Sequence, residues 1–138
     1  MSAVRRGGDT LEEIYTLPTI RPFVAGEKQT IAMTLRTAKP NSKPFDATGC
    51  TINFSVINFG NKNGVSIISK LCDIRQDTDG IPCIAVVDLL PLETVTLYGK
   101  YIYQITAIDL DGNTEIPMQG LMFITKNINQ GFIQSNIS

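Results

Sequence analysis

The segment that most constrains the fold of this chain is residues 98–125, in which a short polar turn joins two β-rich runs. Residues 98–108 are rich in tyrosine and isoleucine, and residues 114–125 form the second run. Asp111 and Gly112 lie between the two. An Asp-Gly pair flanked by such runs is a strong short-range signal for a β-hairpin. We therefore predict a hairpin whose turn is formed by Asp111 and Gly112.

The tyrosines at the start of this segment indicate which kind of β-fold the hairpin closes. Gly99, Tyr101 and Tyr103 have the spacing seen where the penultimate strand of immunoglobulin-like domains begins. In those domains a tyrosine hydroxyl bonds back to the preceding corner, two residues before a core position. Gly99 and Tyr101 are thus predicted to form a structural tyrosine corner. Tyr103 would occupy the core position, which is cysteine in disulfide-bearing domains.

The rest of the chain shows the spacing of short strands and turns that is typical of a sandwich. Residues 27–36 place Ile31, Met33 and Leu35 on one face, and residues 51–56 alternate in the same way. Further strands are expected at residues 65–71 and 81–90, with loops or connections at 37–49 and 91–97. We expect a first strand within residues 11–17, although a helical turn could start there, and an interruption at Pro18 and Pro22.

These patterns predict an all-β fold, an immunoglobulin-like antiparallel β-sandwich of about seven to eight strands. With 138 residues, of which 43% are hydrophobic and 18% charged, the chain has the size and composition of one ordered domain. We assign the sandwich to residues 11–125. Residues 1–10, which contain Gly7 and Gly8, are predicted to be a flexible N-terminal arm, and residues 126–138 a C-terminal tail.

The tail is unusual because isoleucine and phenylalanine alternate with asparagine and glutamine. Ile128, Phe132, Ile133 and Ile137 make it too apolar for a solvated tail. Two alternatives remain open from the residues alone. Either the tail folds back over the domain, or it docks on another subunit, where an added strand would form main-chain hydrogen bonds and the apolar side chains would act as anchors.

The residue types argue against catalysis and against a metal or cofactor site. The chain has no histidine, so neither a Ser-His-Asp nor a Cys-His arrangement can form. The carboxylates at Asp77/Asp79 and Asp109/Asp111 lie in polar turns, where water keeps both members ionised. Neither turn continues into a calcium-binding loop. We expect no enzyme activity and no cofactor, and we expect the three cysteines to be free thiols, as suits a reducing compartment.

The charge and hydropathy patterns also indicate which class of partner the chain binds. A net charge of −1 with scattered lysines and arginines provides no basic stripe for nucleic acid. No apolar run approaches the roughly 20 residues that span a bilayer. The N-terminal residues do not have the pattern of a secretory signal peptide. Partners are therefore expected to be proteins rather than nucleic acid or membranes.

Residues 25–128 resemble the N-terminal immunoglobulin-like domain of tailed-phage baseplate upper proteins. The similarity rests on glycines, tyrosines and turn residues in seven short segments: residues 30–36, 43–49, 51–54, 79–80, 98–104, 109–113 and 116–128. The resemblance implies a virion structural adaptor that attaches to other baseplate or tail proteins, commonly as a trimer, with no catalytic residues. It also implies a location in the virion tail after assembly in the bacterial cytoplasm.

One feature separates this chain from that family. Residues 126–138 provide neither a coiled coil nor a receptor-binding head after the domain, so the resemblance favours a virion structural domain over a complete baseplate organiser. The alternative hypothesis is a bacterial immunoglobulin-like adhesion or carbohydrate-binding module. Oligomeric state and glycan binding would distinguish the two.

Overall fold

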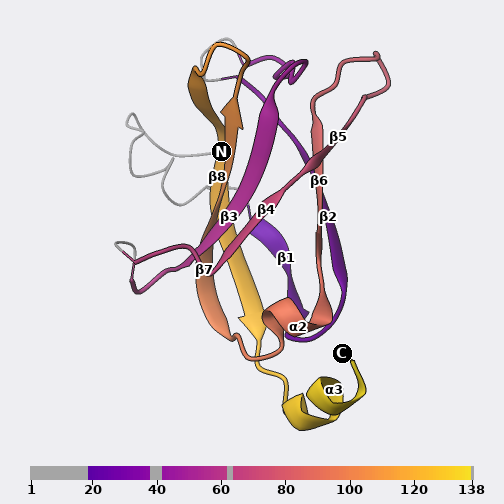
Figure 1. Ribbon diagram of the computed structural model, residues 1–138, viewed down its shortest axis with the longest axis vertical. Coiled ribbons are helices and arrows are strands. Elements are labelled where there is room, and N and C mark those ends of the chain that lie inside the picture. Colours follow the sequence, from indigo (N-terminus) through magenta and orange to yellow (C-terminus); the bar gives the residue numbers. More distant parts are fainter. Residues whose placement is uncertain (1–18, 38–41, 62–63, 138) are drawn as a thin grey trace, which may run out of the picture.

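The computed structural model of the chain describes residues 19–37, 42–61 and 64–137. The predicted arm at residues 1–10 and the predicted first strand at residues 11–17 lie outside the described residues. The described chain forms two β-sheets that pack face to face (Figure 1). One sheet has the strand order β1-β8-β7-β3-β4 and the other the order β2-β6-β5. The fold is an immunoglobulin-like β-sandwich, as predicted.

The larger sheet is built around the hairpin of β7 and β8. Its strands are β1 (Thr19–Val24), β3 (Thr51–Asn58), β4 (Ile68–Leu71), β7 (Gly99–Ile108) and β8 (Thr114–Thr125). The two longest strands, β7 and β8, pair antiparallel along nearly their whole length, with Tyr103 opposite Gly120. Strand β3 pairs antiparallel with the other side of β7. The predicted hairpin is therefore the centre of this sheet.

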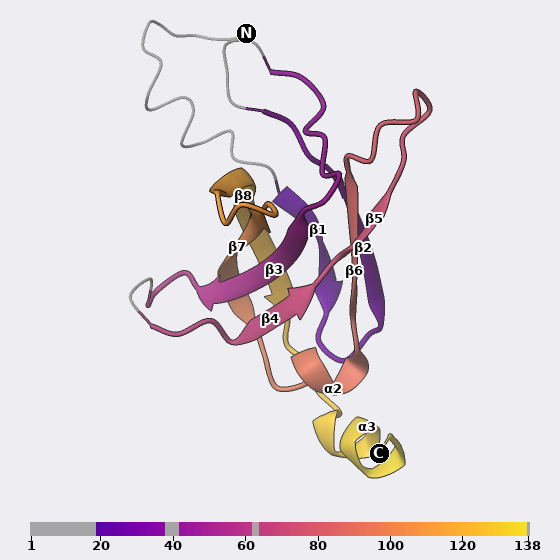
Figure 2. The same ribbon diagram turned by 45° about the horizontal axis from the view of Figure 1, so that its top comes forward.

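The smaller sheet consists of β2 (Gln29–Thr34), β5 (Asp73–Arg75) and β6 (Ile84–Leu89). The chain passes from one sheet to the other within a single residue, because β4 ends at Leu71 and β5 begins at Asp73 (Figure 2). Cys72, which lies between them, still donates its backbone N–H to the Ile52 carbonyl of β3 at 2.8 Å. The strand predicted at residues 65–71 is thus present as β4 over residues 68–71, and the chain crosses to the smaller sheet directly after it.

The core lies between the two sheets and follows the alternation in the sequence. On β2, Ile31 and Met33 are buried, and the threonines on either side of them are exposed. On β3 the buried residues are Ile52, Phe54 and Val56. The Phe54 ring stacks on Tyr103 of β7 with 5.8 Å between the ring centroids. Burying one face of each strand in this way supplies most of the driving force for packing the sheets.

Pro22 does not interrupt the chain as the sequence suggested, because β1 runs through it. Strand β1 lies at the edge of the larger sheet, and its pairing with β8 shifts register between Ile20 and Phe23. A proline is tolerated at such an irregular edge because its missing N–H is not needed there. The pairing of β1 with β8 is also parallel, unlike the other strand pairs of the described sandwich.

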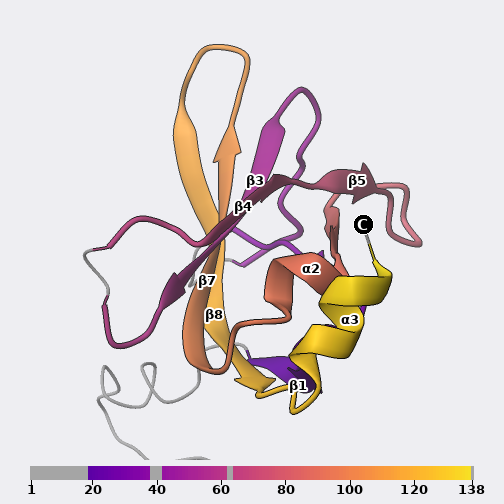
Figure 3. The same cartoon turned by 60° about the horizontal axis from the view of Figure 1, so that its bottom comes forward.

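Two short helices lie at the end of the sandwich opposite the turn between β7 and β8 (Figures 1 and 3). Helix α2 (Pro91–Thr94) is part of the predicted connection between β6 and β7, and helix α3 (Gln130–Asn136) follows β8. Lys70 of β4 anchors the α2 end through an ion pair with Glu93 at 2.8 Å. Neither helix in the described part of the chain has the length and apolar character that crossing a membrane requires.

Candidate interaction surfaces

The predicted tyrosine corner is present at the start of β7. The Tyr101 hydroxyl donates to the Tyr98 carbonyl at 2.9 Å and accepts from the Tyr98 N–H at 3.1 Å. Gly99 has φ +109°, in the left-handed region that favours glycine. Burial raises the pKa of Tyr101 above its ordinary value, so the hydroxyl stays protonated. The structure therefore places Gly99 and Tyr101 in the predicted corner at the start of β7, where Tyr101 is buried and Gly99 is exposed.

The turn between β7 and β8 depends on a residue that the sequence analysis placed in a polar turn without giving it a structural role. Asp111 and Gly112 lie in the turn, and Gly112 has φ +85°. The residue that organises the turn is Asp109, whose Oδ1 accepts from the backbone N–H groups of Asp111 and Asn113, each at 2.9 Å. An aspartate at the start of a loop commonly forms this arrangement, and that signal could have identified Asp109. These bonds, chiefly that from Asn113, lower the pKa of Asp109.

The same turn presents an apolar side chain to solvent. Leu110 is 90% exposed. It lies between Asp109 and Asp111, and the Asp111 carboxylate accepts none of the hydrogen bonds within the turn. We call residues 109–113 the hairpin tip. The tip therefore combines one exposed leucine with carboxylates on both sides.

The C-terminal tail folds back against the opposite end of the sandwich. Asn127 Nδ2 donates to the Ala25 carbonyl at 2.8 Å. A Cβ added at Gly26 would lie 2.8 Å from Ile133 Cδ1, so Ile133 occupies the space above that glycine. For Ile133, the structure thus shows the first of the two alternatives, in which the tail packs on its own domain.

In the single chain, residues 130–136 of the tail form helix α3 and not a strand. The physical reason lies just before the helix. Asn127 Oδ1 accepts the N–H of Asn129 at 2.6 Å, which turns the chain away from the direction of β8. The residues that follow are then free to close helical hydrogen bonds instead of strand bonds.

The structure divides the four residues predicted for subunit docking into two groups. Ile133 is half-buried against the domain. Ile128, Phe132 and Ile137 are exposed, with Ile128 98% and Phe132 64% accessible. The three exposed side chains need no movement of the tail to reach a partner.

A hollow of about 660 Å³ lies beside α3 at this end of the molecule. Its lining residues are Thr96, Tyr98, Lys126, Asn127, Ile128 and Gln130. Tyr98 is 60% exposed. The Lys126 Nζ atom lies 5.5 Å from the centroid of the Tyr98 ring, a cation–π distance. The hollow thus offers an aromatic ring, an aliphatic side chain and a positive charge together. Of these three residues, the sequence analysis had predicted only Ile128 as a docking residue.

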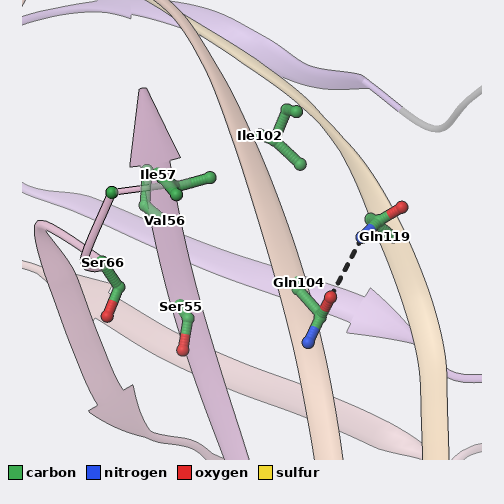
Figure 4. A pocket seen from close by; sticks show the side chains of 8 residues that line it. Ser55, Val56, Ile57, Ser66, Ile102, Gln104 and Gln119 are labelled. Carbon is green, nitrogen blue, oxygen red and sulfur yellow. Dashed lines mark hydrogen bonds between the residues drawn. The ribbon is translucent and has the colours of Figure 1, made fainter. Parts of the chain in front are cut away.

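A second hollow, of about 550 Å³, lies on the outer face of the larger sheet (Figure 4). Its lining contains Ser55, Ser66 and the side chains of Ile57 and Ile102, together with two glutamines. Gln119 Nε2 donates to Gln104 Oε1 at 3.0 Å, so the two amides form a fixed pair across β7 and β8. The lining residues carry no charge. Hydroxyl and amide groups around aliphatic side chains are suited to a neutral, hydroxyl-bearing ligand.

Comparisons with known proteins identify no family for this chain. No protein-family model matches it, and no curated protein matches it. Among solved structures, the chain is similar to CopC from Methylosinus trichosporium OB3b. The two are 11% identical over 79% of this chain and 87% of that chain, with a TM-score of 0.41.

The thiols and carboxylates of the described residues do not gather into a reactive centre. The described part of the chain contains no group of three or more histidine, cysteine, aspartate or glutamate side chains able to hold a metal ion. Cys50, Cys72 and Cys83 are all free thiols. Burial, with a contribution from Asp73, raises the pKa of Cys72 to about 11, which keeps this thiol protonated near neutral pH. The features suited to binding a ligand or a partner are therefore the two hollows described above, the tip and the exposed residues of the tail.

Proposed function

We propose that this chain is a non-enzymatic virion structural module, an adaptor in the baseplate or tail of a phage or prophage that assembles by protein–protein contacts. The observation that carries the proposal is the exposed apolar side of the tail. Ile128, Phe132 and Ile137 are exposed, and helix α3 lies at one end of the sandwich (Figure 1). The resemblance of residues 25–128 to the immunoglobulin-like domain of baseplate upper proteins supports the same role.

The chemistry of the tail fits a contact with another protein. Residues 127–137 carry no charged side chain, so a partner surface can cover them without removing a charge from water. Depletion of charge together with exposed aromatic and aliphatic side chains is characteristic of the centre of protein interfaces. Tyr98 lines the same hollow as Ile128 and adds an exposed aromatic ring.

The proposed partners are other phage tail or baseplate proteins and further copies of this chain, with a homotrimer as the assembly that the resemblance implies. The proposed location is the virion tail, reached after assembly in the bacterial cytoplasm. Free thiols at three positions suit assembly in that reducing compartment.

Light scattering on the purified protein tests the proposal. We expect a stable oligomer that falls to monomer in the triple variant Ile128→Ser/Phe132→Ser/Ile137→Ser, because the contact would bury exposed apolar side chains of the tail. The control is Gln134→Ser, which changes an exposed polar side chain of the same helix and is expected to leave the oligomer intact. A wild-type monomer that binds glycans would contradict the proposal.

The outer-face hollow favours a second candidate, an adhesion or carbohydrate-binding module. Its uncharged amides and hydroxyls are the groups that would bond a sugar. A glycan array probed with the wild-type protein and with Gln104→Leu tests this candidate. Binding of a neutral oligosaccharide that is lost in the variant would support it, whereas an array without binding would eliminate it.

A further inference from the structure

The two ends of the β7–β8 hairpin carry features that complement each other. At one end is the hairpin tip, with Leu110 exposed between two carboxylates. At the other end, next to α3, is the hollow that contains Tyr98, Lys126 and Ile128. Because β7 begins at Gly99 and ends at Ile108, the hollow and the tip are separated by the length of that strand (Figures 1 and 3).

The tip combines negative charge with an apolar side chain that is 90% exposed, which neither the loop at Val65 nor the turn at residues 77–80 does. Val65 is also 90% exposed, but its neighbours Gly64 and Ser66 carry no charge. The turn at residues 77–80 carries two carboxylates but no large apolar side chain. Asp109 is held ionised by its hydrogen bonds within the turn, so the tip keeps its charge at neutral pH. A site for this tip must therefore offer both an apolar surface and a cation.

The hollow beside α3 offers these two elements. Tyr98 and Ile128 supply the apolar surface, being 60% and 98% exposed. Among the described residues, no carboxylate forms an ion pair with Lys126, whose ammonium lies near the Tyr98 ring. A cation without a carboxylate partner and next to exposed apolar groups is available for an incoming acidic group. At about 660 Å³ the hollow has the size of sites that hold a ligand of several side-chain volumes.

We propose that the hairpin tip of one copy of this chain inserts into the hollow beside α3 of the next copy. Leu110 packs against Tyr98 and Ile128, and the Asp111 carboxylate pairs with Lys126. This contact rests on the proposed function, in that it names a second copy of the chain as one of its partners. The contact is head-to-tail because the two patches are different and lie at opposite ends. Repetition of such a contact produces a closed ring or an open filament.

Two variants, each with one defective patch, test the contact. The tip variant is Leu110→Ser/Asp111→Asn, which leaves the hollow intact. The hollow variant is Lys126→Gln/Ile128→Ser, which leaves the tip intact. The four replaced side chains are exposed in the structure, so both variants are expected to fold, and circular dichroism checks this. Val65→Ser is the matched control, because Val65 is as exposed as Leu110 but lies on another loop.

Sedimentation velocity on the full chain, at concentrations up to about 1 mM, gives the readout. We expect oligomers from the wild type and from Val65→Ser, and monomers from each patch variant alone. An equimolar mixture of the two patch variants should form dimers and nothing larger. The reason is that each mixed pair has one intact tip and one intact hollow, and then no free complementary pair remains.

Three outcomes would overturn the inference. The first is a mixture that stays monomeric. The second is assembly that persists in both patch variants but disappears in Phe132→Ser/Ile137→Ser, which would leave the proposed function standing with a different contact. The third is a wild type that is monomeric throughout, which would also remove self-assembly from the proposed function and leave only other tail proteins as partners.

Discussion

The Tyr101 hydroxyl is bonded twice to the backbone of Tyr98, donating to its carbonyl at 2.9 Å and accepting from its N–H at 3.1 Å. Two residues further along β7, Tyr103 is equally buried, with 2% of its surface exposed. No hydrogen bond to the Tyr103 hydroxyl is present within the described part of the chain, and burial alone raises its pKa. The two tyrosines lie on the same face of β7, but only the hydroxyl of Tyr101 forms hydrogen bonds within the described residues.

Replacing each tyrosine by phenylalanine should therefore have unequal effects. We expect Tyr101→Phe to lower the free energy of unfolding by about 1–2 kcal/mol, since two hydrogen bonds of the corner are lost. We expect Tyr103→Phe to be neutral or slightly stabilising, because it removes a buried polar group without a partner. Urea unfolding followed by circular dichroism measures both. Equal losses in the two variants would show that the hydroxyl of Tyr103 is satisfied.

Gly26 and Gly112 provide a matched pair for testing how the tail packs. Both have positive φ, +89° and +85°, so alanine at either position costs about 1 kcal/mol of backbone strain. A Cβ at Gly26 would also lie 2.8 Å from Ile133 Cδ1, whereas nothing lies within 4 Å of a Cβ at Gly112. We expect Gly26→Ala, but not Gly112→Ala, to displace α3.

Limited proteolysis measures this displacement. The Gly26→Ala protein should lose its C-terminal residues faster than the wild type at the same protease concentration, because an opened helix exposes its backbone. Gly112→Ala should be cut in the tail at the wild-type rate even though its stability is lower. Equal tail cleavage in the two variants would count against the contact between Ile133 and Gly26.

The Asp109 carboxylate predicts a loss of stability in acid. The N–H groups of the turn, above all that of Asn113, favour the ionised form, so the pKa of Asp109 is lower in the folded chain than in the unfolded chain. The stabilisation is present above the unfolded pKa of about 3.9 and is lost as the pH falls through the lower folded pKa. Asp109→Asn should therefore be less stable than the wild type at pH 7 and lose less stability on acidification below pH 4.

Urea unfolding at several pH values between about 2 and 7 tests this dependence. Asp111→Asn is the control, because its carboxylate accepts none of the hydrogen bonds within the turn. This control should keep the wild-type loss of stability in acid. Asp77 holds its own turn in the same way, with a lowered pKa, so Asp109→Asn should reduce the acid effect and not abolish it. An unchanged acid profile in Asp109→Asn would disprove the role given to its carboxylate.

The Cys72 thiol should react slowly in the folded protein. With its pKa raised to about 11 by burial and by Asp73, little thiolate exists at pH 8. An ordinary cysteine of pKa about 8.5 is roughly a quarter thiolate at that pH, and we expect Cys72 to be alkylated at least about tenfold more slowly than in the unfolded chain. Iodoacetamide labelling followed by peptide mass spectrometry gives the rate at each cysteine. A folded-state rate at Cys72 equal to that in urea would rule out the raised pKa.

Much of the fold was accessible from local sequence patterns. The alternation of residues 51–56 identified the face of β3 that packs in the core, and the spacing of Gly99, Tyr101 and Tyr103 identified the corner. Each of these signals lies within one strand or one turn, so the physical cause is contained in a few consecutive residues. The parts that were missed depend on contacts between distant segments.

The tail shows why such contacts escape a local analysis. Its apolar residues were recognised as unusual. The hydrogen bonds that hold this end of the sandwich together, however, join residues that are far apart in the sequence. Asn127 bonds to Ala25 across 102 residues, and Thr94 Oγ1 accepts the Gly26 N–H across 68 residues. No periodicity within residues 126–138 indicates that Gly26 leaves room for Ile133. The helix and its half-buried isoleucine therefore followed from tertiary packing.

The sequence by itself determined the fold class, the hairpin, the corner and the set of apolar tail residues, because strand periodicity and turn chemistry are properties of neighbouring residues. The tertiary structure decided which strand joins which sheet, including the switch at Cys72 and the parallel pairing of β1. It also brought Ile133 of the tail against Gly26. Alternation reports that one face of a strand is buried, but the partner that buries it is chosen by the packing of the whole chain.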